Sequence, residues 1–190
     1  MEIEKTNIPG LILIKPKVFG DSRGYFFESF NKRKWKEVGL NPDFIQDNIS
    51  KSKKNTIRGL HYQVMEFSQG KLCQVLQGKV LDVAVDIRFG SPTFGKYYSV
   101  ELSDENHFIV WIPPGFAHGF SVLSDETIFS YKCTKLYSKE HERAIIYNDA
   151  DLKIDWRVEN PIVSEKDLSA KNFREIQNDF IYQHDDLLSN

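Results

Sequence analysis

The sequence has little of what secreted and membrane proteins depend on. Two cysteines, Cys73 and Cys133, in 190 residues are too few for a disulfide framework or a zinc finger. The longest apolar runs, such as 11–14 and 108–112, are far shorter than the roughly 20 residues of a membrane-spanning helix. The first residues include Glu2 and Glu4 and show no apolar segment typical of a secretory signal. We therefore expect a soluble, cytoplasmic protein with no membrane partner.

The chain also lacks an excess of positive charge. Lysine and arginine total 25 residues and aspartate and glutamate total 27, which gives a net charge of −2. A protein that binds duplex nucleic acid needs a basic excess or a basic stripe to contact the phosphates. Nucleic acid is therefore not expected as a partner.

Several catalytic motifs are missing as well. The sequence contains no G-x-S-x-G elbow, no P-loop and no dinucleotide fingerprint, which argues against nucleophilic hydrolysis, ATP chemistry and hydride transfer. None of the five histidines forms an H-x-H or H-E-x-x-H pair. A metal site would have to be assembled from distant positions, for example from His61 and His118 together. Spacing alone therefore does not favour a metal site, and that pair is the open alternative.

Aromatic residues, in contrast, are abundant at 13%, and they fall in short segments with period-2 alternation. The clearest segment is 79–87, where Leu81, Val83 and Val85 share one face while Asp82 and Asp86 share the other. Similar segments, separated by turn residues, are 11–14, 24–30, 43–49, 56–64, 70–77, 94–102, 107–112, 117–123 and 127–134. About ten short strands at near-regular spacing predict a mainly β fold, as a sandwich, jelly roll or barrel.

Two helical stretches interrupt this pattern. The first begins at an Asn31 cap and ends near Val38, before Gly39, and the second covers roughly 165–180. The chain is predicted to form one domain over 1–190, with its core at about 5–170 and a helical, polar tail at 171–190 that frays after Tyr182.

Polar residues recur on strand faces that otherwise look buried. Residues predicted to share one face of a strand are Glu28 and Phe26, Gln46 and Asn48, Lys71 and Cys73, and Tyr131 and Phe129. Because strand faces alternate strictly, buried polar side chains need partners or a ligand. A bulge at Gly59 would also turn Arg58 and His61 toward one cavity. The pattern therefore predicts a polar-lined pocket in the mouth of a small barrel.

Each of these residues has an alternative structural role. Tyr131 fits a core tyrosine with its hydroxyl at the rim, and Lys71 fits a side chain that extends from an edge strand into water. His61 fits a hydrogen-bonded interior histidine, and Arg23 an ordinary loop charge.

Nine collinear blocks closely resemble the dTDP-4-dehydrorhamnose 3,5-epimerases, a family of cupin-type enzymes of nucleotide-sugar metabolism. The blocks are Lys17–Asp21 with Glu28–Phe30, Gln46–Asn48, Arg58–Gln63, Gln69–Leu72, Asp82–Arg88, Ser91–Gly95, Trp111–Phe120, Tyr131–Thr134 and Ser164–Asp167. The resemblance covers about residues 5 to 170. It implies a cupin-type jelly-roll β-barrel, a homodimer, and cofactor-free 3,5-epimerisation of dTDP-4-dehydro-6-deoxy-D-glucose to dTDP-4-dehydro-L-rhamnose.

The resemblance also implies roles for individual residues. His61 corresponds to the general base, oriented by Asp167, and Tyr131 to the acid that returns a proton from the opposite side. Lys71 corresponds to the residue that polarises the C4 carbonyl. The substrate-contacting positions of the family match Arg23, Phe26, Glu28, Gln46, Asn48, Arg58, Lys71, His118, Tyr137, Glu142 and Lys166.

The chemistry requires these residue types. A hydrogen next to a ketone is a weak carbon acid, so its removal needs a base and a stabilised enolate. Imidazole is a suitable base near pH 7, and a carboxylate fixes its tautomer. We therefore expect His61 and Asp167 to lie within hydrogen-bond reach, although 106 positions (167 − 61) separate them.

Three other functions remain open. The first is an epimerase that acts on another 4-keto nucleotide sugar or inverts only one carbon. The second is a barrel that binds a nucleotide sugar without catalysis, and the third is a metal-dependent cupin oxygenase. A binder needs the arginines but no base and acid, and an oxygenase commonly carries an H-x-H motif.

Overall fold

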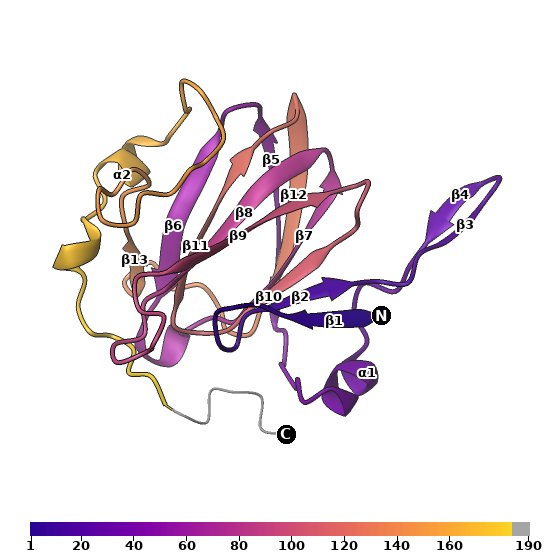
Figure 1. Cartoon of the computed structure of the whole chain (residues 1–190), viewed down its shortest axis with the longest axis horizontal. Coiled ribbons are helices and arrows are strands. Elements are labelled where there is room, and N and C mark those ends of the chain that lie inside the picture. Colours follow the sequence, from indigo (N-terminus) through magenta and orange to yellow (C-terminus); the bar gives the residue numbers. More distant parts are fainter. Residues whose placement is uncertain (184–190) are drawn as a thin grey trace.

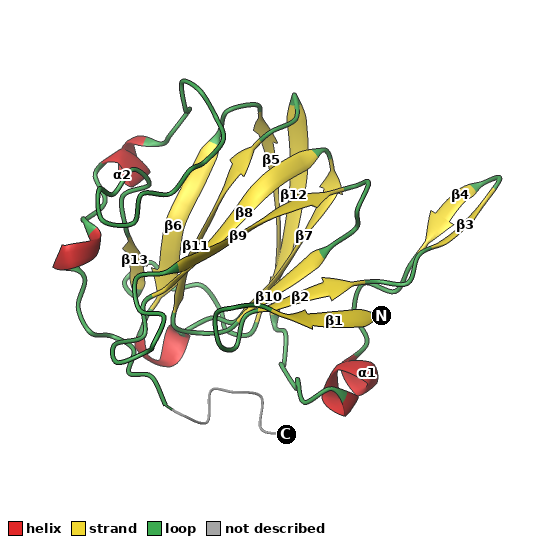
Figure 2. Ribbon diagram, viewed as in Figure 1, coloured by secondary structure: helices red, strands yellow, loops and turns green. Residues whose placement is uncertain are grey.

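The structure, a computed structural model, describes residues 1–183. Two antiparallel sheets face each other (Figures 1 and 2). The six-stranded sheet has the order β1 (Glu2–Lys5), β2 (Ile12–Lys15), β10 (Ile109–Ile112), β7 (Lys71–Gln77), β12 (Glu126–Cys133) and β5 (Gln46–Lys53). The five-stranded sheet has the order β13 (Glu142–Ala144), β6 (Ile57–Gln63), β11 (Phe116–Val122), β8 (Lys79–Asp86) and β9 (Tyr97–Ser103). The predicted mainly β, cupin-type jelly roll is confirmed.

The alternation predicted for 79–87 sorts the residues of β8 between two apolar layers. Val80 and Ala84 belong to the core between the sheets. Leu81, Val83 and Val85 point to the outer face of the five-stranded sheet, where they pack in a second core beneath C-terminal residues. The face that carries Asp82 and Asp86 is therefore the one turned away from this outer layer.

A third apolar cluster covers the outside of the six-stranded sheet. Helix α1 (Lys32–Glu37) places Trp35, which is only 2% exposed, against Ile12, Ile14 and Trp111 of that sheet. The side chain of Asn31 accepts hydrogen bonds from the first turn of α1 and caps it, as predicted.

The segment predicted as a strand over 24–30 is shorter than expected. β4 (Gly24–Phe26) ends at Phe26 and pairs only with β3 (Phe19–Asp21), and this hairpin projects from the body of the molecule (Figure 1). The prediction that Phe26 and Glu28 share a strand face is therefore wrong. Glu28 lies outside the strand and accepts hydrogen bonds from Lys34 and Asn31 beside α1.

The helix predicted over 165–180 is also wrong in its extent. Only α2 (Glu165–Leu168) and two short 3-10 turns, η1 (Met65–Phe67) and η2 (Phe173–Glu175), accompany α1 among the described residues. Phe173, Ile176 and Phe180 pack against the outer core of the five-stranded sheet from a segment that is mostly without regular secondary structure. The end of the tail expected over 171–190 lies outside the described residues.

The bulge predicted at Gly59 is confirmed. Between Arg58 and His61, β6 holds one residue more than the facing stretch of β11. Gly59 has φ +132°, and a Cβ there would lie 2.5 Å from the Cα of Gly119. Only glycine fits this close approach of two backbones. Within residues 1–183 the structure has no helix of the length and apolarity that crossing a membrane would require.

Candidate active site

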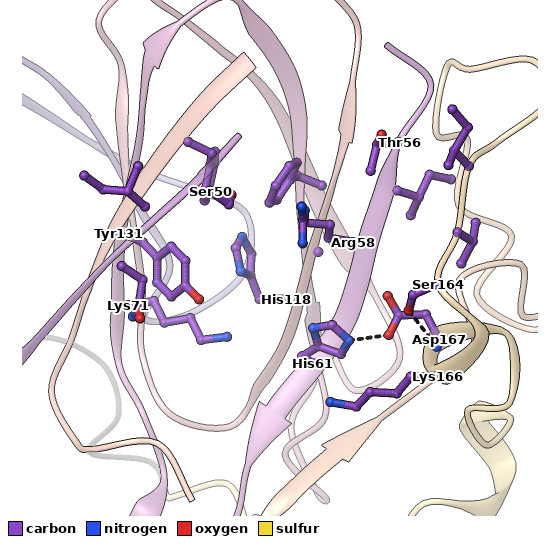
Figure 3. A pocket seen from close by; sticks show the side chains of 18 residues that line it. Ser50, Thr56, Arg58, His61, Lys71, His118, Tyr131, Ser164, Lys166 and Asp167 are labelled. Atoms are coloured by element: carbon purple, nitrogen blue, oxygen red, sulfur yellow. Dashed lines mark hydrogen bonds and ion pairs between the residues drawn. The ribbon is translucent and has the colours of Figure 1, made fainter. Parts of the chain in front are cut away.

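A cavity of about 610 Å³ receives side chains from both sheets and from the C-terminal segment. Eight of the residues predicted for the site line it: Asn48, Arg58, His61, Lys71, His118, Tyr131, Lys166 and Asp167. Lys71 and Tyr131 come from β7 and β12 of one sheet, whereas His61 comes from β6 of the other. Figure 3 shows these groups facing one another across the cavity.

His61 and Asp167 form a hydrogen-bonded dyad, as expected. His61 Nε2 lies 2.7 Å from Asp167 Oδ1. Asp167 is only 3% exposed and stands in the first turn of α2, where the Ser164 side chain accepts a hydrogen bond from its backbone N–H. The backbone N–H of Gly59 donates a further hydrogen bond to Asp167 Oδ2. The bulge and the capped turn therefore hold the carboxylate in place against the imidazole.

The electrostatics of Asp167 favour its ionised form. Burial alone raises the pKa of this carboxyl, but the hydrogen bond and charge of His61, with the contacts of Gly59 and Ser164, outweigh burial and lower the pKa below its ordinary value. An ionised Asp167 accepts a hydrogen bond from the Nε2–H of His61. The basic nitrogen of the neutral ring is then Nδ1, and Figure 3 shows the second ring nitrogen on the cavity side.

The opposite wall carries a proton donor and a positive charge. Burial is the main cause that raises the pKa of Tyr131 to about 12, so its phenol keeps its proton through the neutral range. The Lys71 ammonium lies 6.0 Å from the centre of the Tyr131 ring and points into the cavity (Figure 3). This arrangement places a base on one side of a bound molecule, and an acid and a cation on the other.

The comparisons with known proteins agree with this geometry. The family profile described as dTDP-4-dehydrorhamnose 3,5-epimerase matches residues 5–175. The chain belongs to the dTDP-4-dehydrorhamnose 3,5-epimerase family. The dTDP-4-dehydrorhamnose 3,5-epimerase of Shigella flexneri is 53% identical over 91% of this chain and 96% of that protein.

Solved structures of relatives have the same fold. The dTDP-6-deoxy-D-glucose-3,5-epimerase of Legionella pneumophila, in complex with dTDP-4-keto-L-rhamnose, is 49% identical with a TM-score of 0.92, over 96% of this chain and 98% of that one. A 3'-monoepimerase of Streptomyces bikiniensis, in complex with dTDP-quinovose, is 30% identical with a TM-score of 0.84, over 89% and 86% of the two chains.

Three further residues predicted from the family resemblance gather at the side of the cavity. Lys166 also lines a second cavity of about 650 Å³, together with Tyr137 and Glu142. The Tyr137 hydroxyl donates a 2.8 Å hydrogen bond to Glu142 Oε2, and the Lys166 ammonium pairs with the same oxygen. Gln46 accepts a 2.8 Å hydrogen bond from the backbone N–H of Tyr137. The two cavities therefore meet at Lys166.

The structure does not bring Arg23, Phe26 and Glu28 to the cavity of their own chain. Arg23 pairs with Asp21 at the tip of the projecting hairpin, and Phe26 on β4 is 69% exposed. Glu28 lies beside α1, as described above. The family resemblance predicted that these three residues contact the substrate, but none of them lines the cavity of the single chain.

Two features of the site escaped the sequence analysis. The first is the partner of His118, whose Nε2 lies 2.8 Å from Asp82 Oδ2. Both residues are nearly fully buried. The alternation of β8 places Asp82 on the face opposite Leu81 and Val83, and a buried carboxylate on that face requires a partner. That pattern was the available signal.

The second feature is Ser50. Its hydroxyl is the one buried side-chain polar atom without a hydrogen-bond partner within residues 1–183, and Ser50 lines the cavity. Ser50 has the parity of Gln46 and Asn48 on β5, so the same alternation could have extended the predicted polar face by one residue. An unpaired buried hydroxyl beside a cavity is suited to a ligand contact.

Proposed function

We propose that this chain is a dTDP-4-dehydrorhamnose 3,5-epimerase that converts dTDP-4-dehydro-6-deoxy-D-glucose to dTDP-4-dehydro-L-rhamnose. The observation that carries the proposal is a His–Asp dyad facing a protonated tyrosine across one cavity. A protein that only binds a nucleotide sugar does not need a base and an acid on opposite walls of its cavity. The 53% identity to an enzyme named for this activity supports the same conclusion.

The first step is removal of a proton from the carbon next to the C4 ketone. Neutral His61 takes the proton on Nδ1, and the pair of electrons left behind moves into the carbonyl to form an enolate. Asp167 stabilises the imidazolium that forms, because it is ionised and hydrogen-bonded to the other ring nitrogen. The Lys71 ammonium stabilises the negative enolate oxygen.

The second step returns a proton to the same carbon from the opposite face. Tyr131 donates its phenolic proton, and the carbonyl re-forms as the enolate collapses. The raised pKa does not prevent this transfer, since an enolate carbon is far more basic than a phenolate. The phenolate then regains a proton from solvent and the imidazolium loses one, which resets the site for the other carbon. These steps use side chains of the protein and protons exchanged with solvent.

The remaining cavity residues suit the rest of the substrate. Arg58 can contact the diphosphate, because a guanidinium matches phosphate oxygens in pairs. Asn48, His118 and Ser50 supply polar contacts along the sugar. Tyr137, Glu142 and Lys166 line the second cavity, and the Tyr137 ring there is suited to stacking on thymine.

We further infer a homodimer in which the β3–β4 hairpin reaches the cavity of the partner subunit. The hairpin projects from the molecule (Figure 1), and Phe19, Tyr25 and Phe26 on it are each more than half exposed. Exposed aromatic side chains on a projecting hairpin are typical of a protein interface. In such a dimer, Arg23 and Phe26 would contact the substrate in the partner's cavity, which they do not reach in their own chain. A cytoplasmic location is in keeping with two free cysteines.

Proton NMR of the dTDP-4-keto substrate, incubated with the enzyme in D2O, tests the activity directly. We expect the hydrogens at both C3 and C5 to be replaced by deuterium and the L-rhamno configuration to accumulate. Exchange and inversion at one carbon only would instead identify a single-carbon epimerase. Tight binding with no exchange would identify a binding protein.

A further inference from the structure

One buried cluster of metal-ligand side chains takes no part in the proton transfers. Cys73 of β7, Asp82 of β8 and His118 of β11 converge from the two facing sheets, and each is less than a tenth exposed. His118 Nε2 lies 2.8 Å from Asp82 Oδ2 and 3.9 Å from Cys73 Sγ. The three ligand atoms all lie within 4.8 Å of one another.

These distances are near those of a tetrahedral zinc centre. Zinc binds sulfur at about 2.3 Å and nitrogen or oxygen at about 2.0–2.1 Å, so tetrahedral ligand atoms lie about 3.3–3.6 Å apart. Two of the pairs, at 2.8 Å and 3.9 Å, differ from that range by about half an ångström. The third pair, Cys73 Sγ and the Asp82 carboxylate, lies within 4.8 Å and has to approach by up to about 1.3 Å. A thiolate, an imidazole and a carboxylate also suit zinc chemically, since it accepts sulfur, nitrogen and oxygen ligands.

We propose that Cys73, Asp82 and His118 bind one Zn²⁺ ion per chain and that this ion inhibits the enzyme. His118 is the one of the three that lines the active-site cavity, so the ion would enter, and find a fourth ligand, from that side. Binding replaces the thiol proton of Cys73 with a Zn–S bond and releases the proton to solvent. It also replaces the hydrogen bond between His118 and Asp82: Nε2 gives up its proton to solvent, Nδ1 takes one up, and the ring stays neutral with no change in oxidation state.

The charge balance favours the ion. A thiolate and a carboxylate together carry two negative charges, which the dication neutralises in a buried site. The inhibitory consequence rests on the proposed function. Inhibition follows for two reasons. The ion takes His118 away from the substrate. It also binds Cys73, which pairs across β7 and β12 with the proton donor Tyr131.

A titration of the purified full-length chain tests the binding itself. Co²⁺ serves as the spectroscopic probe, because cobalt bound to a thiolate absorbs in the near ultraviolet, and Zn²⁺ then displaces it. Cys73→Val removes the thiolate and keeps an apolar side chain of similar size in the core. Cys133→Val is the matched control, since Cys133 is equally buried but outside the cluster. Cys73→Ala provides a second variant if Cys73→Val does not fold.

The wild type and Cys133→Val should bind one Co²⁺ with the thiolate band, whereas Cys73→Val should lose at least about 100-fold in Zn²⁺ affinity. Zn²⁺ should inhibit the wild type reversibly on chelation and leave the folded Cys73 variant uninhibited. Absence of the thiolate band in the wild type, or equal affinity in the Cys73 variants, would overturn the site. Because the band is independent of turnover, a lack of epimerase activity would not imitate this result.

Discussion

At the residue level, the base is defined by which nitrogen of His61 remains available. The ionised Asp167 holds Nε2 at 2.7 Å, and it is itself fixed by Gly59 and by the capped first turn of α2. This pairing is not visible in any local pattern, since 106 positions separate the two residues. The family resemblance predicted it, whereas strand parity alone predicted only that His61 would face a cavity.

Replacing the two members of the dyad should affect turnover to different extents. His61→Asn removes the base and should lower kcat by about 10³-fold or more. Asp167→Asn keeps the base but can donate a hydrogen bond to Nε2 and cannot stabilise the imidazolium, so kcat should fall by about 10²-fold. Turnover followed by NMR, with melting temperatures as the control for folding, measures both. A His61→Asn enzyme that keeps a tenth of wild-type kcat would contradict the assignment of the base.

Tyr131→Phe should separate hydrogen exchange from inversion. His61 can still remove the proton and return deuterium to the same face, so exchange with D2O should continue. Inversion needs a donor on the opposite face and should slow by about 10²-fold. Tyr147→Phe, which removes a hydroxyl at the outer core away from the cavity, should change neither rate. Equal loss of exchange and inversion in Tyr131→Phe would show that Tyr131 has another role.

At the level of elements, the bulge in β6 determines where the base and Arg58 point. Strict alternation would send positions 58 and 61 to opposite faces, and the additional residue turns both to the cavity. Gly59 was a usable sequence signal because a glycine within a strand pattern often marks a bulge. The close contact with Gly119 was not predictable from sequence, because it depends on the neighbouring strand.

Gly59→Ala should therefore lower the free energy of unfolding by more than backbone strain alone would. Gly24 offers a matched control: its φ is +130°, close to that of Gly59, but a Cβ there would meet nothing within 4 Å. We expect Gly24→Ala to lower the free energy of unfolding by about 1–2 kcal/mol, from backbone strain. Gly59→Ala should lose about 2 kcal/mol more, from the contact with Gly119, and most of its activity. Equal losses in denaturant titrations would show that the contact with Gly119 relaxes freely.

The prediction of secondary structure from sequence succeeded where the residue pattern fitted only one type of element. It failed where the spacing of apolar residues was compatible with more than one conformation. The alternation over 79–87 matches β8, because the buried residues of its outer face are all apolar whereas its inner face includes Asp82 and Asp86. Over 165–180 the spacing of Phe173, Ile176 and Phe180 suited a helix, yet most of the segment has no regular secondary structure. The outer face of the sheet, which is not local information, decided the conformation.

For the whole molecule, buried carboxylates connect stability to pH. Burial raises the pKa of Asp86, but hydrogen bonds from Arg88, Ser91 and Thr93 outweigh burial and lower the pKa below its ordinary value of 3.8. A carboxyl whose folded pKa is lowered contributes stability above its unfolded pKa, and that contribution is lost as pH falls through the folded pKa.

The protein should therefore lose stability as the pH falls below about 4, and Asp86→Asn should reduce this dependence. The variant should also be less stable at neutral pH by roughly 2–4 kcal/mol, because Asp86 is fully buried in its hydrogen-bond network. Unfolding curves between pH 3 and 7 measure both effects. Asp125→Asn, which changes a carboxylate whose side chain is 98% exposed, is the control and should leave the curve unchanged. An identical acid dependence in Asp86→Asn would contradict the attribution.

The proposed dimer makes a quantitative prediction about mixed subunits. His61→Asn destroys the cavity chemistry of its own chain but leaves its hairpin intact, whereas Arg23→Ala with Phe26→Ala disables the hairpin and leaves the cavity intact. Each variant alone should therefore be nearly inactive.

When the two variants are unfolded together, mixed in equal amounts and refolded, about half of the dimers pair one variant with the other. Each mixed dimer then holds one complete site, formed by an intact cavity and an intact hairpin, so about a quarter of wild-type activity should return. The same variants refolded separately and then combined at low temperature provide the control, because intact dimers that do not exchange subunits cannot complement. If the hairpin served its own chain, each mixed dimer would hold only defective sites. Mixing would then restore nothing, and that outcome would refute the shared active site even if the protein proved to be a dimer.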